Sequence, residues 1–101
     1  MKLNVLERIT ALGIMPEVGN FATLKIVQDL RMVLSLTEAE FKEFGVKQKG
    51  EQMSWSPKGA EEREIKIGEK ATDILIEALK KLDEDKKLTE QHLSLYEKFV
   101  K

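Results

Sequence analysis

The spacing of apolar side chains changes twice along this chain, and the change restricts the folds that it can adopt. Before residue 46 and after residue 68, apolar residues recur every three or four positions, which is the period of an amphipathic helix. Between these limits, Met53 and Trp55 alternate with polar residues, and so do Ile65 and Ile67, which is the period of a strand. The two periods together predict an α+β fold made mainly of helices.

Two helices are expected in the first third of the chain. The first covers residues 3–12, and its apolar stripe stops before Pro16. The second begins after Asn20, a favourable N-cap residue, and ends near Ser35. Because apolar residues cover much of its circumference, we expect this second helix and the fourth to be central in the fold.

A short third helix follows at once. The sequence Thr37-Glu38-Ala39-Glu40 is a capping-box pattern, in which the side chains of Thr37 and Glu40 accept hydrogen bonds from each other's backbone N–H. The helix should run to Phe44, because Gly45 is a suitable residue just beyond a helix end.

The strand-like region predicts a β-hairpin with strands at residues 51–56 and 62–67. Pro57-Lys58-Gly59-Ala60 would form the loop between them. The apolar face of this hairpin should pack against helices, because an isolated two-stranded hairpin is only marginally stable in water.

Two further helices complete the prediction. Residues 69–84 carry the clearest helical stripe in the chain, and Thr89 is a suitable cap for a fifth helix that reaches Val100. The predicted order is α-α-α-β-β-α-α, with the hairpin between helices 3 and 4, which resembles the order of a winged helix. With 101 residues and 11.6 kDa, we expect a single domain over residues 1–101.

Composition excludes several classes of function. The chain has no cysteine, so disulfides, thiolate catalysis and cysteine-ligated metals are excluded. Seventeen basic and eighteen acidic residues nearly cancel, so no overall positive field attracts nucleic acid or anionic lipid. Glu7 and Arg8 interrupt the N-terminal region before a signal peptide could form, and no apolar run approaches the length of a membrane span. We therefore expect a cytoplasmic protein.

No residue pattern indicates catalysis. His92, the only histidine, lies beside an apolar stripe without neighbouring ligands, and Asp73 and Glu77 have a spacing common on solvated helices. Ser54 and Ser56 lie in no nucleophile motif, and phosphate-binding glycine loops are missing. We therefore expect no enzyme activity, no cofactor and no metal site.

Trp55, together with Met53, is the most informative candidate site. A single tryptophan is most often a core anchor, but on a projecting hairpin it would be an exposed interface anchor or a platform for ligand stacking. The acidic run Glu61-Glu62-Arg63-Glu64 is either a solvated edge or a contact surface for a basic partner. The predicted interface comprises Met53, Trp55, Glu61, Glu62 and Glu64.

The winged-helix order suggests an alternative function in DNA binding. In that reading, residues 37–44 would be the reading helix, and the hairpin would be the wing. The predicted reading helix carries three glutamates and one lysine, and the predicted wing tip carries Glu61, Glu62 and Glu64. Phosphate would repel such a surface, so nucleic acid is a disfavoured partner.

Three segments resemble small uncharacterised proteins encoded by bacteriophages and prophages: Asn20–Lys25, Ile65–Ala71 and Leu88–Phe99. The resemblance implies an accessory role in the bacterial cytoplasm, such as modulation of a host or phage protein. We therefore predict a non-enzymatic protein that acts by regulatory or inhibitory protein binding. The partner would be a host or phage protein or a second copy of the chain, so a homodimer is a further expectation; the alternative is a winged-helix-like regulator of transcription or replication.

Overall fold

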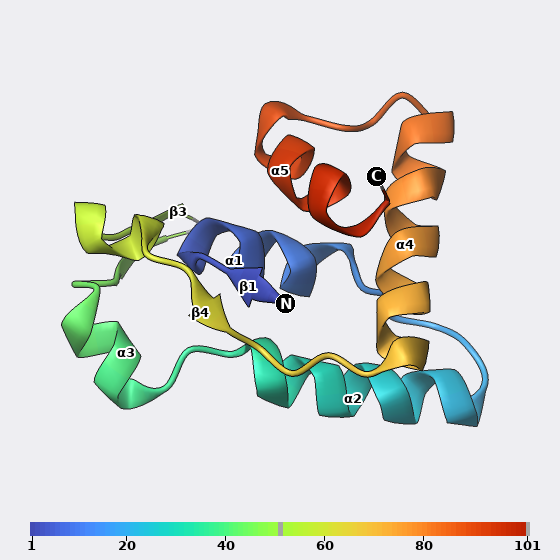
Figure 1. Cartoon of the computed structure of the whole chain (residues 1–101), viewed down its shortest axis with the longest axis horizontal. Helices are drawn as coiled ribbons and strands as arrows, with labels where there is room; N and C mark the ends of the chain where they lie inside the picture. The colour runs from blue at the N-terminus through green and yellow to red at the C-terminus, as the bar shows by residue number, and fades with distance from the viewer. Residues whose placement is uncertain (51, 101) are drawn as a thin grey trace.

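A computed structural model describes residues 1–50 and 52–100, which form five α-helices, one short 3₁₀-helix and four short strands (Figure 1). The α-helices are α1 (Val5–Ile14), α2 (Phe21–Leu34), α3 (Glu38–Glu43), α4 (Glu69–Glu84) and α5 (Glu90–Phe99), and the 3₁₀-helix η1 covers Pro57–Ala60. The strands are β1 (Lys2–Leu3), β2 (Lys47–Lys49), β3 (Gln52–Ser54) and β4 (Arg63–Glu64). The fold is α+β and mainly helical, with a hairpin between α3 and α4, as predicted.

The predicted starts of α2 and α3 agree with the hydrogen bonds at their caps. The side chain of Asn20 accepts from the backbone N–H of Thr23 at 2.8 Å, and Thr37 and Glu40 form the predicted reciprocal capping box. Asn4 and Glu7 form a second capping box at the start of α1, which the sequence analysis did not identify. Because of this cap, the first helix begins two residues later than predicted and runs to Ile14.

β3 and β4 lie within the two predicted strand ranges, but the prediction that these two segments pair with each other is wrong. β2 pairs with β3 in an antiparallel register that places Lys47 opposite Ser54 and Lys49 opposite Gln52. Gly50, with a φ of 61°, allows the tight turn between them, because this left-handed conformation costs glycine little. Residue 51, the predicted start of the first strand, lies outside the described residues.

The second predicted strand, 62–67, belongs to a different sheet. Its β4 portion pairs with β1, so Leu3 lies opposite Arg63. Ile65 is buried, which explains its apolar character without hairpin pairing. The intervening segment forms η1 instead of a hairpin loop, and Pro57 occupies its first turn, where a proline needs no backbone donor.

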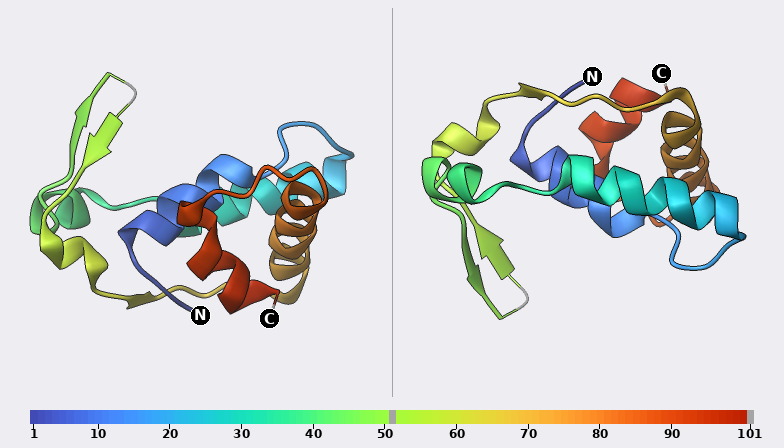
Figure 2. Two further views of the ribbon diagram at one scale, coloured as in Figure 1. Left: turned by 90° about the horizontal axis from the view of Figure 1, so that it is seen from above. Right: turned by 90° about the horizontal axis from the view of Figure 1, so that it is seen from below.

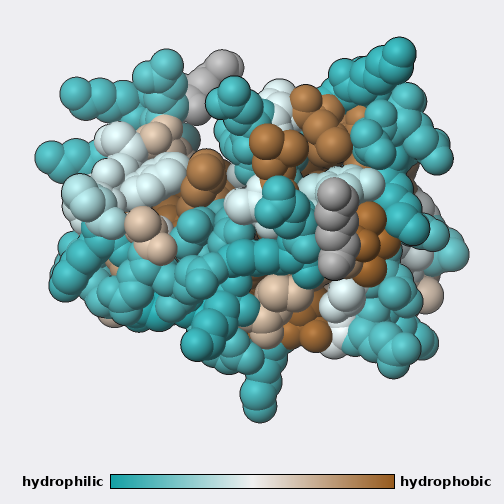
Figure 3. Space-filling view, turned by 45° about the horizontal axis from the view of Figure 1, so that its top comes forward, coloured by the Kyte–Doolittle hydropathy of each residue, from teal (hydrophilic) through white to brown (hydrophobic). Residues whose placement is uncertain are grey.

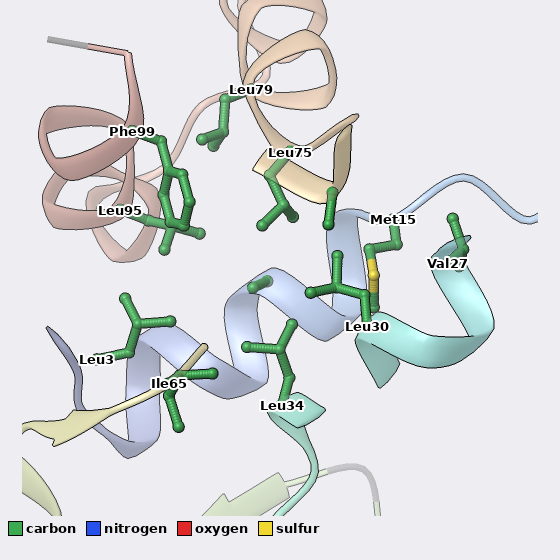
Figure 4. Packing of buried hydrophobic residues seen from close by; sticks show 12 residues of the cluster. Leu3, Met15, Val27, Leu30, Leu34, Ile65, Leu75, Leu79, Leu95 and Phe99 are labelled. Carbon is green, nitrogen blue, oxygen red and sulfur yellow. The ribbon is translucent and has the colours of Figure 1, made fainter. Parts of the chain in front are cut away.

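The central helix is α1, and the prediction that α2 and α4 are central is wrong. α1 contacts α2, α4, α5 and η1, and α5 lies across it in Figure 1. The core lies between these elements, where Leu34 of α2, Leu75 of α4 and Leu95 of α5 converge (Figure 4). Apolar residues around most of α2 suggested that it was enclosed, but its outer face is exposed.

Two buried charged residues of α1 join this helix to β1, α2, α3 and α5. Glu7 is 1% exposed and Arg8 is 2% exposed. Glu7 accepts hydrogen bonds from the backbone N–H of Asn4 at 3.0 Å and from Lys98 Nζ at 2.8 Å. Lys98 also donates to the carbonyl of Lys2 at 2.9 Å, so β1, α1 and the end of α5 are joined.

Arg8 joins α1 to the end of α2 and to α3. Its Nε and Nη2 donate to the carbonyls of Leu34 and Ser35 at 3.0 and 2.8 Å. Its Nη1 and Nη2 donate to the Glu40 carboxylate at 2.7 and 3.1 Å. Arg8 therefore satisfies carbonyls that the helix end leaves unpaired and neutralises one acid of α3.

Because of the Arg8–Glu40 contact, the free energy of unfolding depends on pH in the acid range. Hydrogen bonding from Arg8 lowers the pKa of Glu40 from 4.5 to about 2, although burial opposes the shift. The folded state therefore resists protonation of Glu40 more than the unfolded state does. The resulting stabilisation is complete above the unfolded pKa and is lost as the pH falls toward about 2.

We expect Glu40→Gln to lower the free energy of unfolding by about 2 kcal/mol at neutral pH, because the substitution removes charge-assisted hydrogen bonds. The difference from wild type should shrink as the pH falls from 4.5 to about 2. Urea titrations across this range measure both quantities. The control is Glu38→Gln, an exposed acid on the same helix and outside this ion pair. A pH-independent difference for Glu40→Gln would contradict the assignment.

Candidate interaction surfaces

Met53 lies in the middle of β3 and Trp55 directly follows this strand, in the hairpin that projects away from the helices (Figure 2). Both side chains are half-buried and line a hollow of about 340 Å³ beside Leu6 and Ile9 of α1 and His92 of α5. Met53 and Ile9 also line an adjoining hollow of about 290 Å³ that reaches Phe41 of α3. Trp55 is thus neither fully buried nor fully exposed, and a role in partner binding stays a prediction.

Trp55 is held in place by η1. A Cβ atom added at Gly59 would lie 2.3 Å from Cδ1 of the indole, so only glycine fits beneath the ring. The glycine lets the backbone of η1 pack directly on Trp55, and this contact fixes the base of the hairpin.

The three predicted acidic residues do not form a free acidic tip. Glu61, Glu62 and Glu64 are exposed, but each forms an ion pair. Glu61 pairs with Arg63 at 3.3 Å, Glu62 pairs with Lys98, and Glu64 pairs with the N-terminal amine at 3.3 Å. These contacts hold the segment before α4 against β1 and α5.

The pKa values of Glu62 and Lys98 agree with a structural role for this ion pair. The hydrogen bond from Lys98 lowers the pKa of Glu62. Burial alone would lower the pKa of Lys98, but its hydrogen bonds to Glu62 and Glu7 outweigh burial and raise it. Both partners therefore stay charged at neutral pH.

Glu61, Glu62 and Glu64 do not lie at the tip of the hairpin, contrary to the prediction, because the hairpin is formed by β2 and β3 and these three residues follow η1. In the observed register Lys47, Lys49, Gln52 and Ser54 occupy one exposed face of the hairpin. On α3, the Arg8 side chain neutralises Glu40, and Arg63 pairs with Glu43. The face formed by α3 and the hairpin is therefore less negative than the sequence suggested.

The outer face of α2 carries a surface that the sequence analysis did not identify. Phe21 is 84% exposed and Met32 is 75% exposed, and Val18, just before the helix, is 84% exposed. Phe21 and the half-exposed Leu24 also line an open hollow of about 560 Å³ with Pro16, Lys25 and Arg31. The sequence analysis expected this helix to be central and did not separate an exposed apolar face from the buried one.

Elsewhere, large exposed apolar groups are separated from one another. On the side of the molecule seen in Figure 3, hydrophilic side chains cover most of the surface and apolar atoms appear in separate patches. Leu93 of α5 is 51% exposed and Phe41 of α3 is 42% exposed, and each lies on a different helix. Single exposed apolar side chains are normal on soluble proteins, whereas several on one helix face suggest contact with another molecule.

The residues considered for catalysis have structural or solvated positions. The ring Nδ1 of His92 accepts from the backbone N–H of Thr89 at 2.9 Å, which caps the start of α5. Asp73 and Glu77 are exposed on α4. Within residues 1–50 and 52–100, no three histidine, aspartate or glutamate side chains gather as a metal site would require.

The described helices include none with the length and apolar character of a membrane span. Compared with models of protein families, with curated proteins and with solved structures, the chain matches none.

We expect Gly59→Ala to lower the free energy of unfolding by about 1–3 kcal/mol, because the added methyl group displaces the Trp55 ring. Gly13→Ala is the matched control. It lies within α1 with open space around its Cβ position, so it should raise stability by up to about 1 kcal/mol. Urea unfolding followed by the fluorescence of the single tryptophan measures both variants. Equal stabilisation by both substitutions would show that η1 does not hold the ring.

Proposed function

We propose that this chain is a non-enzymatic accessory protein that acts by binding another protein through the outer face of α2. The observation that carries the proposal is the exposure of Phe21 and Met32, 84% and 75%, on the side of the helix that faces away from the core. Removal of such side chains from water on binding favours association, at roughly 25 cal/mol per Å² of apolar area.

The composition of this face is typical of a protein-binding surface. Aromatic residues and methionine are enriched at interfaces, and this face carries Phe21 and Met32. Arg31 adds a guanidinium group, and arginine is common at binding hot spots. The open hollow beside Phe21 offers space for a side chain of the partner. The resemblance to phage-encoded proteins supports a regulatory or inhibitory role toward a host or phage protein.

The exposed residues on the outer face of α2 are separate from the buried residues through which this helix stabilises the fold. Val27, Leu30 and Leu34 bury the inner side of α2, and they are 3%, 3% and 0% exposed. Substitution of outer residues therefore leaves the core contacts unchanged. Binding and folding can be tested independently on this helix.

We expect Phe21→Ser to reduce capture of a specific protein from bacterial lysate by roughly tenfold, because an aromatic anchor often carries much of the binding energy. Wild type, Phe21→Ser and the control Leu93→Ser, an exposed apolar residue of α5, are compared as affinity baits. Circular dichroism checks that all three are folded. If Phe21→Ser captures the same proteins as wild type, and Trp55→Ala, while folded, loses them, the interface is the hairpin base.

One observation favours the alternative of DNA binding through a winged-helix-like face. The projecting hairpin presents Lys47 and Lys49 together, and two of the three glutamates on α3 are paired within the chain. Cations on a projecting hairpin can contact the phosphate backbone.

In that case, random duplex DNA should bind at low salt, and affinity should fall steeply as salt is added. The double variant Lys47→Gln, Lys49→Gln should reduce the slope of log affinity against log salt by about 2. Fluorescence anisotropy measures both. The absence of binding at the lowest salt would exclude this alternative, and it would leave the protein-binding proposal unaffected.

A further inference from the structure

The outer face of α2 has the residue spacing of a helix-pairing seam. Phe21, Lys25, Gln28 and Met32 follow one another at intervals of four, three and four residues, so they form one stripe along the helix. All four side chains are exposed. Among the described residues, no other element packs over this stripe, because α2 contacts α1 and α4 through its inner side.

We propose that this stripe binds a second copy of the chain, with the two α2 helices antiparallel about a two-fold axis between Ile26 and Val27. The inference rests on the proposed function, because it names the partner for the same surface. In this register Phe21 faces the partner's Met32, and Lys25 faces the partner's Gln28. Two-fold symmetry makes each contact occur twice.

The chemistry of the stripe is complementary to itself in this arrangement. At both ends, an aromatic ring meets a methionine thioether, a favourable contact between apolar groups. In the middle, an ammonium group meets an amide oxygen. Within one chain, Lys25 Nζ already lies 3.3 Å from Gln28 Oε1, so the same groups can exchange partners across the axis. Asp29, adjacent to Gln28, adds a carboxylate near the partner's Lys25.

A parallel arrangement fits the charges less well. It would place each residue of the stripe opposite its own copy, so the two Lys25 ammonium groups would face each other in a partly desolvated seam. Like charges in such positions are destabilising. The antiparallel register avoids this contact and keeps Phe21 opposite an apolar residue.

The length of the seam limits the affinity. A 14-residue helix is roughly 21 Å long, so the two helices alone bury less than the roughly 800 Å² per partner of a standard interface. We therefore expect a dissociation constant in the micromolar range, with monomer and dimer exchanging as the protein is diluted.

Paired charge substitutions test both the dimer and its register. Sedimentation velocity over a wide concentration range measures wild type, Phe21→Glu, Met32→Lys, the double variant Phe21→Glu, Met32→Lys, and the control Leu93→Glu. Each single substitution places a charge against an apolar group and should weaken the dimer by roughly tenfold or more. The double variant should restore dimerisation, because glutamate then faces lysine at both ends of the antiparallel seam.

The outcomes separate this inference from the proposed function. A wild type that stays monomeric at high concentration overturns the inference, whereas the protein-binding proposal still stands if Phe21→Ser loses its captured partner. Single variants that dissociate without rescue by the double variant overturn the antiparallel register, since a parallel pair would place glutamate against glutamate. Dissociation of the Leu93→Glu control would place the contact on α5 and would also overturn the inference.

Discussion

The guanidinium group of Arg8 is the contact on which the arrangement of the first half of the molecule depends. It lies almost fully buried on α1, donates to two carbonyls at the end of α2 and binds the Glu40 carboxylate of α3. Burial of an arginine is costly unless its donors are satisfied, so this contact favours the positions that the α2 end and α3 adopt. Arg8 therefore links α3 to the core, and the Arg63–Glu43 ion pair and the buried Phe44 hold the same region.

The adjacent Glu7 has the same role on the opposite side. Its carboxylate caps α1 and binds Lys98, which also reaches β1 and Glu62. Two neighbouring residues of opposite charge therefore organise the two sides of the central helix. These contacts satisfy backbone polar groups at the start of α1 and at the end of α2.

Local sequence patterns predicted the helices, whereas the features that depend on contacts between distant segments were not predicted. Asn20 and the Thr37 capping box identified two helix starts correctly, because caps are formed by residues close in sequence. The pairing of the strands was predicted wrongly, since β3 pairs with β2 and β4 with β1, and Ile65 is apolar because it is buried in the core. The contacts of Glu7 with Lys98 and of Arg8 with α2 and α3 were not predicted, because these partners lie on distant segments. The stripe on α2 could have been found from its four-three-four spacing, but hydropathy alone does not separate an inner from an outer apolar face.

The bond between Glu7 and Lys98 also has a consequence for the order in which the protein forms. Its two residues are 91 positions apart, so the carboxylate has no cationic partner from α5 until α5 itself has left the ribosome. Contacts of such long range must overcome loop-closure entropy before they stabilise the fold. While synthesis continues, α1 can associate with α2 and α3 through Arg8. The side of α1 that carries Glu7 is covered only after α5 has been synthesised.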